Sequence, residues 1–260
     1  MNWTEEQVKL AFHLYCQLPF GKLHSRNPQI IDLASLIGRT PGSVAMKCTN
    51  LASLDPAIIN SGRKGLAGAS ALDRKVWEEF NSDWERLANE CAVELARLHE
   101  KTGLAAKPAE AMIDDVDYTG LTKTAFIKQR VGQNFFRKAV LSAYDNECCM
   151  SGVTDSRLLI ASHILPWKHD SKNRLNPRNG LCLSALHDRA YDRGLITVTT
   201  EHVILISPAL QKQKANAFLA KTLIKLEGTT IKLPARFVPD PAFLNYHHTK
   251  VFANISEAKR

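Results

Sequence analysis

The sequence predicts an α+β protein in which an all-α N-terminal domain precedes a smaller domain built on two strands and a helix. Helical periodicity and capping residues dominate the first hundred residues, whereas a strand, loop, strand and helix pattern follows Leu158. Between them, residues 101–123 combine Gly, Pro, Ala and an acidic patch, as a linker does. We therefore expect domains at residues 1–100 and 124–260, joined by that linker.

Three stretches support the helical prediction for the N-terminal domain. Thr4 is placed to cap a first helix, because acids occupy the following turn and apolar residues then recur at helical spacing. A second helix is predicted in PQIIDLASLIG, and a third begins where Thr40 can cap and Pro41 occupies the first helical position. An amphipathic helix from about Asp73 to Leu98 completes the domain.

The second and third helices resemble a helix-turn-helix segment, in which one helix enters the DNA major groove. Ala34, Gly38 and Val44 carry this resemblance, as a small contact residue, a turn glycine and a core anchor. It implies that the third helix presents an exposed face to DNA, whereas the alternative is a purely structural helical pair. The residues predicted to contact DNA on or beside this face are Arg39, Ser43, Lys47 and Asn50.

The charge of the chain is unevenly distributed. The net charge is +8 at pH 7, and the second half carries all of the excess. From Leu121 to Tyr144 five cations occur without a single acid. This pattern favours a polyanionic partner such as nucleic acid, since a merely solvated helix face more often mixes both signs.

Several function classes are disfavoured by what the sequence lacks. Its apolar runs are far shorter than the roughly 20 residues of a membrane helix, and its first residues have no signal-peptide core. We therefore expect a cytoplasmic protein without a membrane partner. The six cysteines form no CxxC pair, so we expect reduced, mostly buried thiols and no structural zinc.

A histidine and asparagine constellation lies on the strand, loop, strand and helix pattern. The first strand reaches Leu165, the second runs from about Gly180, and the helix carries His187. His163, Asn179 and His187 are spaced 16 and 8 residues apart, with Asp192 five residues further on.

Phosphodiester hydrolysis gives these residue types a chemical reason to occur together. The reaction needs a base that activates water and a cation that stabilises charge on the phosphate and the leaving oxygen. His163 can act as the base, because an unperturbed pKa of about 6.5 leaves much of it neutral in the cytoplasm. His187 can bind the cation, and Asn179 can hold the loop or orient the imidazole of His163.

The pattern of His163, Asn179 and His187 resembles the HNH endonuclease motif, whose fold is called ββα-metal. The likeness extends to the restriction-type HNH endonucleases through CCMSG, SHILPW, NGLCLSALH and YDRG. A lead-in helix, RVGQNFFRKAVLSAY, and a C-terminal extension, LPARFVPDPAFLNYHHTKVF, also resemble that subgroup. The resemblance covers residues 128–252 and implies a metal-dependent endonuclease acting on double-stranded DNA, in restriction or phage defence.

One departure from the family pattern concerns the metal. Many HNH nucleases place an acid or histidine directly before the catalytic histidine, where this chain has Ser162. The cation is then expected on His187 with Asp192, phosphate oxygens and waters, which suits Mg²⁺, with Mn²⁺ or Ni²⁺ as alternatives. Asp192 could instead cap or brace the end of its helix.

Basic side chains around the motif predict a phosphate track. Arg189 and Arg193 are four residues apart and can face the same groove as His187. The histidines outside the motif, His169, His247 and His248, are expected at the surface. The predicted phosphate contacts are Lys168, Lys172, Arg174, Arg178, Arg189 and Arg193.

Two alternatives to a DNA endonuclease remain open at this point. A catalytically idle HNH scaffold could serve as a DNA-binding regulator, and Ser162 is the residue that favours it. A ribonuclease or nuclease toxin is also compatible with the basic surface. Because one active site cuts one strand, cleavage of both DNA strands would require a homodimer or sequential nicking.

Overall fold

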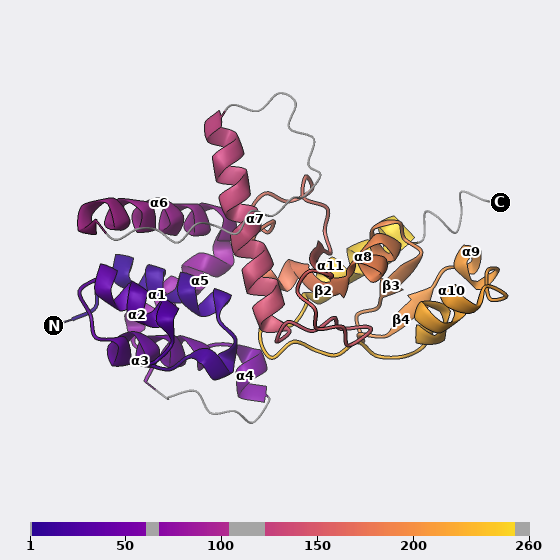
Figure 1. The fold of residues 1–260 in the computed structure, drawn as a ribbon, viewed down its shortest axis with the longest axis horizontal. Helices are drawn as coiled ribbons and strands as arrows, with labels where there is room; N and C mark the ends of the chain where they lie inside the picture. Colours follow the sequence, from indigo (N-terminus) through magenta and orange to yellow (C-terminus); the bar gives the residue numbers. More distant parts are fainter. Residues whose placement is uncertain (1, 61–67, 104–122, 253–260) are drawn as a thin grey trace. The chain divides into compact units, whose positions relative to one another are not determined.

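The computed structural model describes residues 2–60, 68–103 and 123–252 of the chain (Figure 1). It confirms the α+β class, with a helical N-terminal region followed by a region of short strands and helices. The chain divides into two compact units, Met1–Ala139 and Val140–Arg260. Most of the predicted linker, residues 104–122, lies outside the described residues, so the linker and the domain boundaries remain predictions.

The first unit begins as its capping residues predict. The Thr4 hydroxyl accepts a hydrogen bond from the backbone of Gln7, and the Gln7 side chain accepts one from the backbone of Thr4. Thr40 caps the third helix, and Pro41 takes its first position. The helices are α1 (Glu5–Gln17), α2 (Pro28–Leu36), α3 (Pro41–Ala52), α4 (Pro56–Asn60), α5 (Ala71–Ser82) and α6 (Trp84–Thr102), with a 3₁₀ turn at Phe20–Lys22.

The single amphipathic helix expected from Asp73 to Leu98 is wrong. Asp83 has an extended φ of −159°, which separates α5 from α6. Its carboxylate accepts a hydrogen bond from the backbone of Arg86 at 3.0 Å and so begins a new helix. The amphipathic pattern continues through this point because both helices turn an apolar face to one core.

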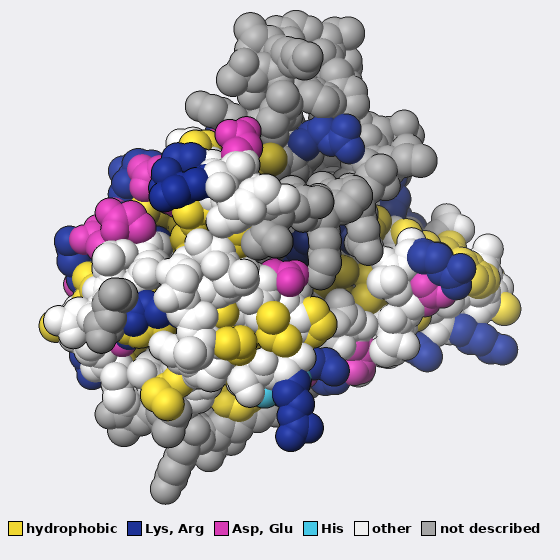
Figure 2. Space-filling model, turned by 60° about the vertical axis from the view of Figure 1, so that its left-hand side comes forward, with side chains coloured by type: hydrophobic (Ala, Val, Ile, Leu, Met, Phe, Trp, Pro, Cys, Tyr) yellow, Lys and Arg dark blue, Asp and Glu magenta, His cyan; other side chains and the backbone are white. Residues whose placement is uncertain are grey.

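An aromatic cluster forms the centre of this core. Phe12 of α1 is fully buried, and its ring centroid lies 4.6 Å from that of Phe80 and 5.8 Å from that of Trp84. Each such ring buries a large apolar area and so contributes strongly to the stability of the core. On the face shown in Figure 2, the hydrophobic side chains that do reach the surface form small separate groups.

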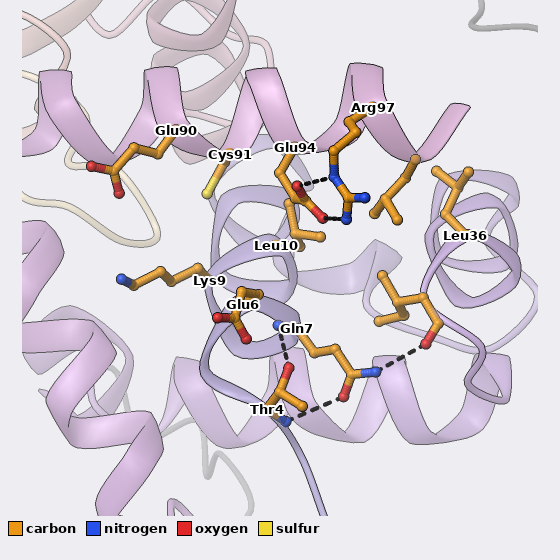
Figure 3. A pocket seen from close by; sticks show the side chains of 12 residues that line it. Thr4, Glu6, Gln7, Lys9, Leu10, Leu36, Glu90, Cys91, Glu94 and Arg97 are labelled. Carbon is orange, nitrogen blue, oxygen red and sulfur yellow. Dashed lines mark hydrogen bonds and ion pairs between the residues drawn. The ribbon is translucent and has the colours of Figure 1, made fainter. Parts of the chain in front are cut away.

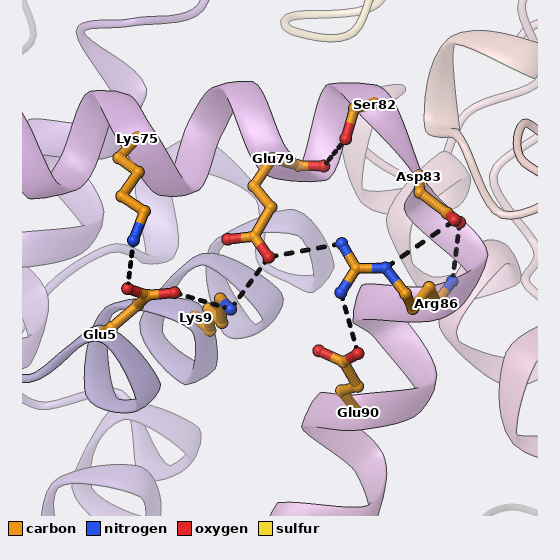
Figure 4. A network of polar contacts seen from close by, with 8 residues as sticks. All are labelled: Glu5, Lys9, Lys75, Glu79, Ser82, Asp83, Arg86 and Glu90. Atoms are coloured by element: carbon orange, nitrogen blue, oxygen red, sulfur yellow. Dashed lines mark hydrogen bonds and ion pairs between the residues drawn. The ribbon is translucent and has the colours of Figure 1, made fainter.

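Ion pairs join α1, α5 and α6 above this core (Figure 4). Lys9 lies 2.9 Å from Glu5 and 3.1 Å from Glu79, so it connects its own helix to α5. Hydrogen bonds from Lys75 and Lys9 lower the pKa of Glu5 to about 2. Glu5 therefore stays charged throughout the neutral range.

The second unit contains two separate antiparallel strand pairs. In the first, β1 (Leu159–His163) pairs with β2 (Gly180–Ser184), and α8 (Ala185–Asp192) packs on both strands. In the second, β3 (Ile196–Val198) pairs with β4 (Ile204–Ile206). The remaining elements are α7 (Lys123–Ala143), which enters this unit from the first, α9 (Pro208–Gln211), α10 (Ala217–Thr222), α11 (Pro241–Tyr246), 3₁₀ turns at Pro177–Asn179 and Ile224–Leu226, and a π-helix at His247–Phe252.

The core of the second unit includes the whole of β2 and part of α8. Every residue of β2 is buried, including Cys182 and Leu183, and Tyr191 of α8 is fully buried too. All six cysteines of the chain are free and buried. No helix within the described ranges is long and apolar enough to cross a membrane.

Candidate nuclease site

The β1–β2 pair brings the first two motif residues together. His163 ends β1 opposite Gly180, the first residue of β2, and Asn179 immediately precedes that glycine. The backbone of Ile164 donates a hydrogen bond to the carbonyl of Asn179 at 2.9 Å. Two residues 16 positions apart in sequence are therefore neighbours at one end of a strand pair.

The hydrogen bond of its ring fixes the tautomer of His163. Nε2 lies 2.9 Å from the backbone carbonyl oxygen of Arg174, and a carbonyl can only accept, so Nε2 carries the hydrogen. In a neutral ring the basic lone pair is then on Nδ1. The Trp167 ring lies perpendicular to the imidazole, with centroids 5.3 Å apart. Burial lowers the pKa of His163 to about 4, so the ring is neutral at pH 7.

Asn179 holds the loop that carries this carbonyl. Its side chain is 1% exposed; Oδ1 accepts from the backbone of Leu165 at 2.7 Å, and Nδ2 donates to the carbonyl of Asn173 at 3.3 Å. Asn173 directly precedes Arg174, the partner of His163. The amide of Asn179 therefore acts on the orientation of the imidazole through the loop backbone.

Both ring nitrogens of His187 are engaged. The side chain is buried on α8, and Nε2 lies 3.2 Å from the carbonyl oxygen of Thr222, to which it must donate. Nδ1 then accepts from the hydroxyl of Ser184 at 2.7 Å. Burial lowers the pKa of His187, so the ring is neutral here as well.

The two predicted metal ligands do not converge in this arrangement. Asp192 follows His187 by five residues, which turns it roughly 140° around the helix, and it is exposed whereas His187 is buried. Partial desolvation and the negative charge of Asp188 raise the pKa of Asp192. Over the described residues, no three His, Cys, Asp or Glu side chains come together as ligands. The donor set as it stands does not fit a cation held by His187 and Asp192, and these metal roles remain predictions.

The predicted phosphate contacts are divided between exposed and engaged side chains. Lys168, Lys172, Arg189 and Arg193 are exposed. Arg178 is half-buried; its guanidinium lies 3.4 Å from the carboxylate of Asp240 and donates to the carbonyl of Val238. Arg174 is half-buried too, with its guanidinium 5.2 Å from the ring centroid of Trp167.

In the helical unit, the expectation that Lys47 is exposed is wrong. Lys47 is 7% exposed, and its ammonium lies 2.7 Å from the carboxylate of Asp73, which is itself fully buried at the start of α5. Arg39 donates to the side chain of Gln7 at 2.9 Å. Ser43 and Asn50 are each half-exposed on α3.

The surface position expected for His247 is also wrong. It is 2% exposed, and its ring stacks on that of Tyr191 with centroids 3.6 Å apart. Nε2 donates to the carbonyl of Tyr191 at 3.1 Å, and Nδ1 accepts from the hydroxyl of Thr197 at 2.8 Å. A sequence signal existed, because His247 follows the buried Leu244 by three residues and so shares its helical face.

A pocket of about 650 Å³ lies elsewhere, within the helical unit (Figure 3). Its wall comes from α1, the end of α2 and α6. Gln7 donates to the carbonyl of Ile37 at 2.9 Å on one side, and Glu94 pairs with Arg97 on the other. None of the predicted nuclease residues lines this pocket.

Comparison with known families identifies the strand and helix region. Residues 148–199 match the family model HNH_2, whose description is HNH endonuclease. The prediction of an HNH domain is confirmed for this segment, about a fifth of the chain, which includes His163, Asn179 and His187. No curated protein matches the chain. An HNH endonuclease domain indicates a nuclease with a nucleic acid substrate, and HNH nucleases generally use a divalent metal ion.

Proposed function

We propose that the protein is a metal-dependent HNH endonuclease that hydrolyses phosphodiester bonds of double-stranded DNA, in restriction or phage defence. One observation carries the proposal. Within the segment that matches the HNH family, the carbonyl of Arg174 holds His163 as a neutral base with its lone pair on Nδ1.

His163 is proposed to take a proton from the attacking water. The low pKa keeps the ring neutral before the reaction, so Nδ1 carries no proton at pH 7. As the ring gains the proton, the hydrogen bond from Nε2 to the Arg174 carbonyl strengthens and stabilises the imidazolium. Asn179 donates to the carbonyl of the preceding residue, Asn173, and is proposed to hold the Arg174 carbonyl in place through this backbone.

The exposed cations near the motif are proposed to bind phosphates on either side of the cut. Exposed cations lie on the loop, on α8 and directly after it, where they can contact a polyanion: Lys168, Lys172, Arg189 and Arg193. DNA selection by the helical unit is proposed to use Arg39, Ser43 and Asn50, without the buried Lys47.

Cleavage of supercoiled plasmid DNA tests the enzymatic proposal. We expect nicking with Mg²⁺ or Mn²⁺, no nicking with excess chelator, and a loss of about 10²- to 10⁴-fold in His163→Ala. His169→Ala, which removes an exposed histidine of the same unit, is the matched control and should cleave normally. Cleavage that persists in His163→Ala would overturn the assignment of the base.

A second candidate, a catalytically idle HNH scaffold that binds DNA, has one observation in its favour. Both ring nitrogens of His187 are already hydrogen-bonded, which leaves no atom of this ring for a cation in the present arrangement. Failure to cleave plain DNA, modified DNA and RNA, combined with tight DNA binding, would favour this candidate. Cleavage of RNA alone would favour a ribonuclease.

A further inference from the structure

The segment around α10 is strongly basic and lacks acids. Between Pro208 and Leu226 the chain has four lysines and no Asp or Glu. Among the described residues, no ion pair involves any of the four, and all are exposed. They are Lys212, Lys214, Lys221 and Lys225.

Phe218 stands among these lysines with its ring in solvent. It is 61% exposed, more than any other large hydrophobic side chain in the described part of the second unit. The opposite side of the segment is anchored, because Leu223 and Leu226 are buried and the Asn216 side chain caps α10. Lys221 follows Phe218 by three residues and so lies on the same side of the helix.

α10 also lies directly beside the candidate site. The Thr222 carbonyl, at the end of α10, is the acceptor for His187 Nε2 at 3.2 Å. The Thr222 hydroxyl donates to the carbonyl of Phe218 at 2.7 Å, one helical turn earlier. The exposed ring therefore lies about one turn of helix from a residue in contact with the HNH motif.

From these observations we propose that α10 is a nucleic-acid contact surface, in which Phe218 stacks on a nucleobase while the flanking lysines contact phosphates. The inference rests on the proposed function for its substrate class. The occupant follows from charge complementarity, since four exposed lysines without acids suit a polyanion, and an aromatic ring among them suits the face of a base. A base displaced or unstacked near the cut would present such a face.

Binding measurements in chelator test this surface without requiring cleavage. Fluorescence anisotropy with labelled duplex DNA, single-stranded DNA and RNA would compare the full-length wild type with Phe218→Ala. We expect affinity to fall by about 5- to 150-fold in Phe218→Ala, and to be retained in Phe218→Trp, which restores a stacking ring. Lys221→Gln should lower the slope of log affinity against log salt by about 0.9 on duplex DNA.

Leu233→Ala is the matched control, because it shortens another exposed apolar side chain of the same unit. It should bind as the wild type does. Equal affinity of Phe218→Ala and wild type for all three nucleic acids would overturn the proposal, as would a wild type that binds none of them. A dimer that Phe218→Ala converts to monomer would also overturn it, because the ring would then pack against a second copy.

Plasmid cleavage by the same proteins separates this inference from the proposed function. If the wild type binds and never cleaves, while Phe218→Ala binds weakly, the contact surface stands and the nuclease proposal falls. If the wild type cleaves and Phe218→Ala binds and cleaves equally well, the nuclease proposal stands and the contact surface falls.

Discussion

His163 and His187 have the same side chain, but their imidazole rings have different hydrogen-bond partners. Each ring donates from Nε2 to a backbone carbonyl, of Arg174 in one case and of Thr222 in the other. The basic nitrogen of His187 already accepts from Ser184, and this bond makes the ring a tie between β2, α8 and α10. The comparison shows that two histidines of one HNH pattern differ in their burial and in their hydrogen-bond partners.

Among the substitutions around these two histidines, His187→Ala is expected to have the largest effect on stability. The substitution leaves the Thr222 carbonyl and the Ser184 hydroxyl without their partner and opens a cavity beside α8. We expect a loss of about 2–4 kcal/mol in the free energy of unfolding, measured by urea denaturation. If His187→Ala keeps full stability but loses Mn²⁺ binding in calorimetry, the structural role is contradicted and a metal-ligand role for His187 is supported.

A loss of about 1–3 kcal/mol is expected from Asn179→Ala, which leaves the buried backbone N–H of Leu165 unpaired and removes one of two donors to the Asn173 carbonyl. The loop that carries the Arg174 carbonyl would also loosen. The cleavage rate should therefore fall by more than the loss of folded protein explains. The check is the cleavage rate of Asn179→Ala at a temperature where the variant is fully folded. A normal rate there would separate Asn179 from the positioning of His163.

The pH dependence of stability should show that the half-buried His163 is neutral in the folded protein. Burial lowers its pKa to about 4, whereas the unfolded chain has a histidine pKa of about 6.5. Between these values the unfolded state binds the proton and the folded state does not, so stability falls as the pH drops from about 6.5 to about 4. Urea midpoints across this range should fall less steeply in His163→Phe, and an unchanged slope would contradict burial.

The smallest effect, about 1 kcal/mol, is expected from Ser184→Ala. This change removes the donor to Nδ1 of His187 while the Thr222 contact remains. If the hydrogen bond to Ser184 is what keeps His187 from binding a cation, Mn²⁺ affinity should rise in the variant. An unchanged affinity would mean that the geometry of the site, and not this bond, excludes the ion.

Most local signals were interpreted correctly from the sequence, although the helix cap at Asp83 was missed. Thr4 and Thr40 cap helices through contacts within three residues, and the strand, loop, strand and helix pattern places His163 beside Asn179. The burial of Lys47 depends on Asp73, 26 residues away.

The environment of His187 depends in the same way on Thr222, 35 residues away. No periodic pattern in the sequence indicates Asp73 or Thr222 as these partners. The sequence therefore predicted an exposed lysine and an imidazole able to bind a cation. Tertiary contacts of this kind decide which polar side chains of a motif remain accessible.

The stack between His247 and Tyr191 has a practical consequence for work on the isolated second unit. Tyr191 belongs to α8, and the π-helix reaches back to it across 56 positions of sequence. A shortened protein that ends before His247 would retain the whole family match. It would lose the ring stack and the hydrogen bond that His247 makes to Tyr191, on the helix that carries His187. Any minimal nuclease fragment should therefore extend to Phe252 at least, well past the last residue of the family match.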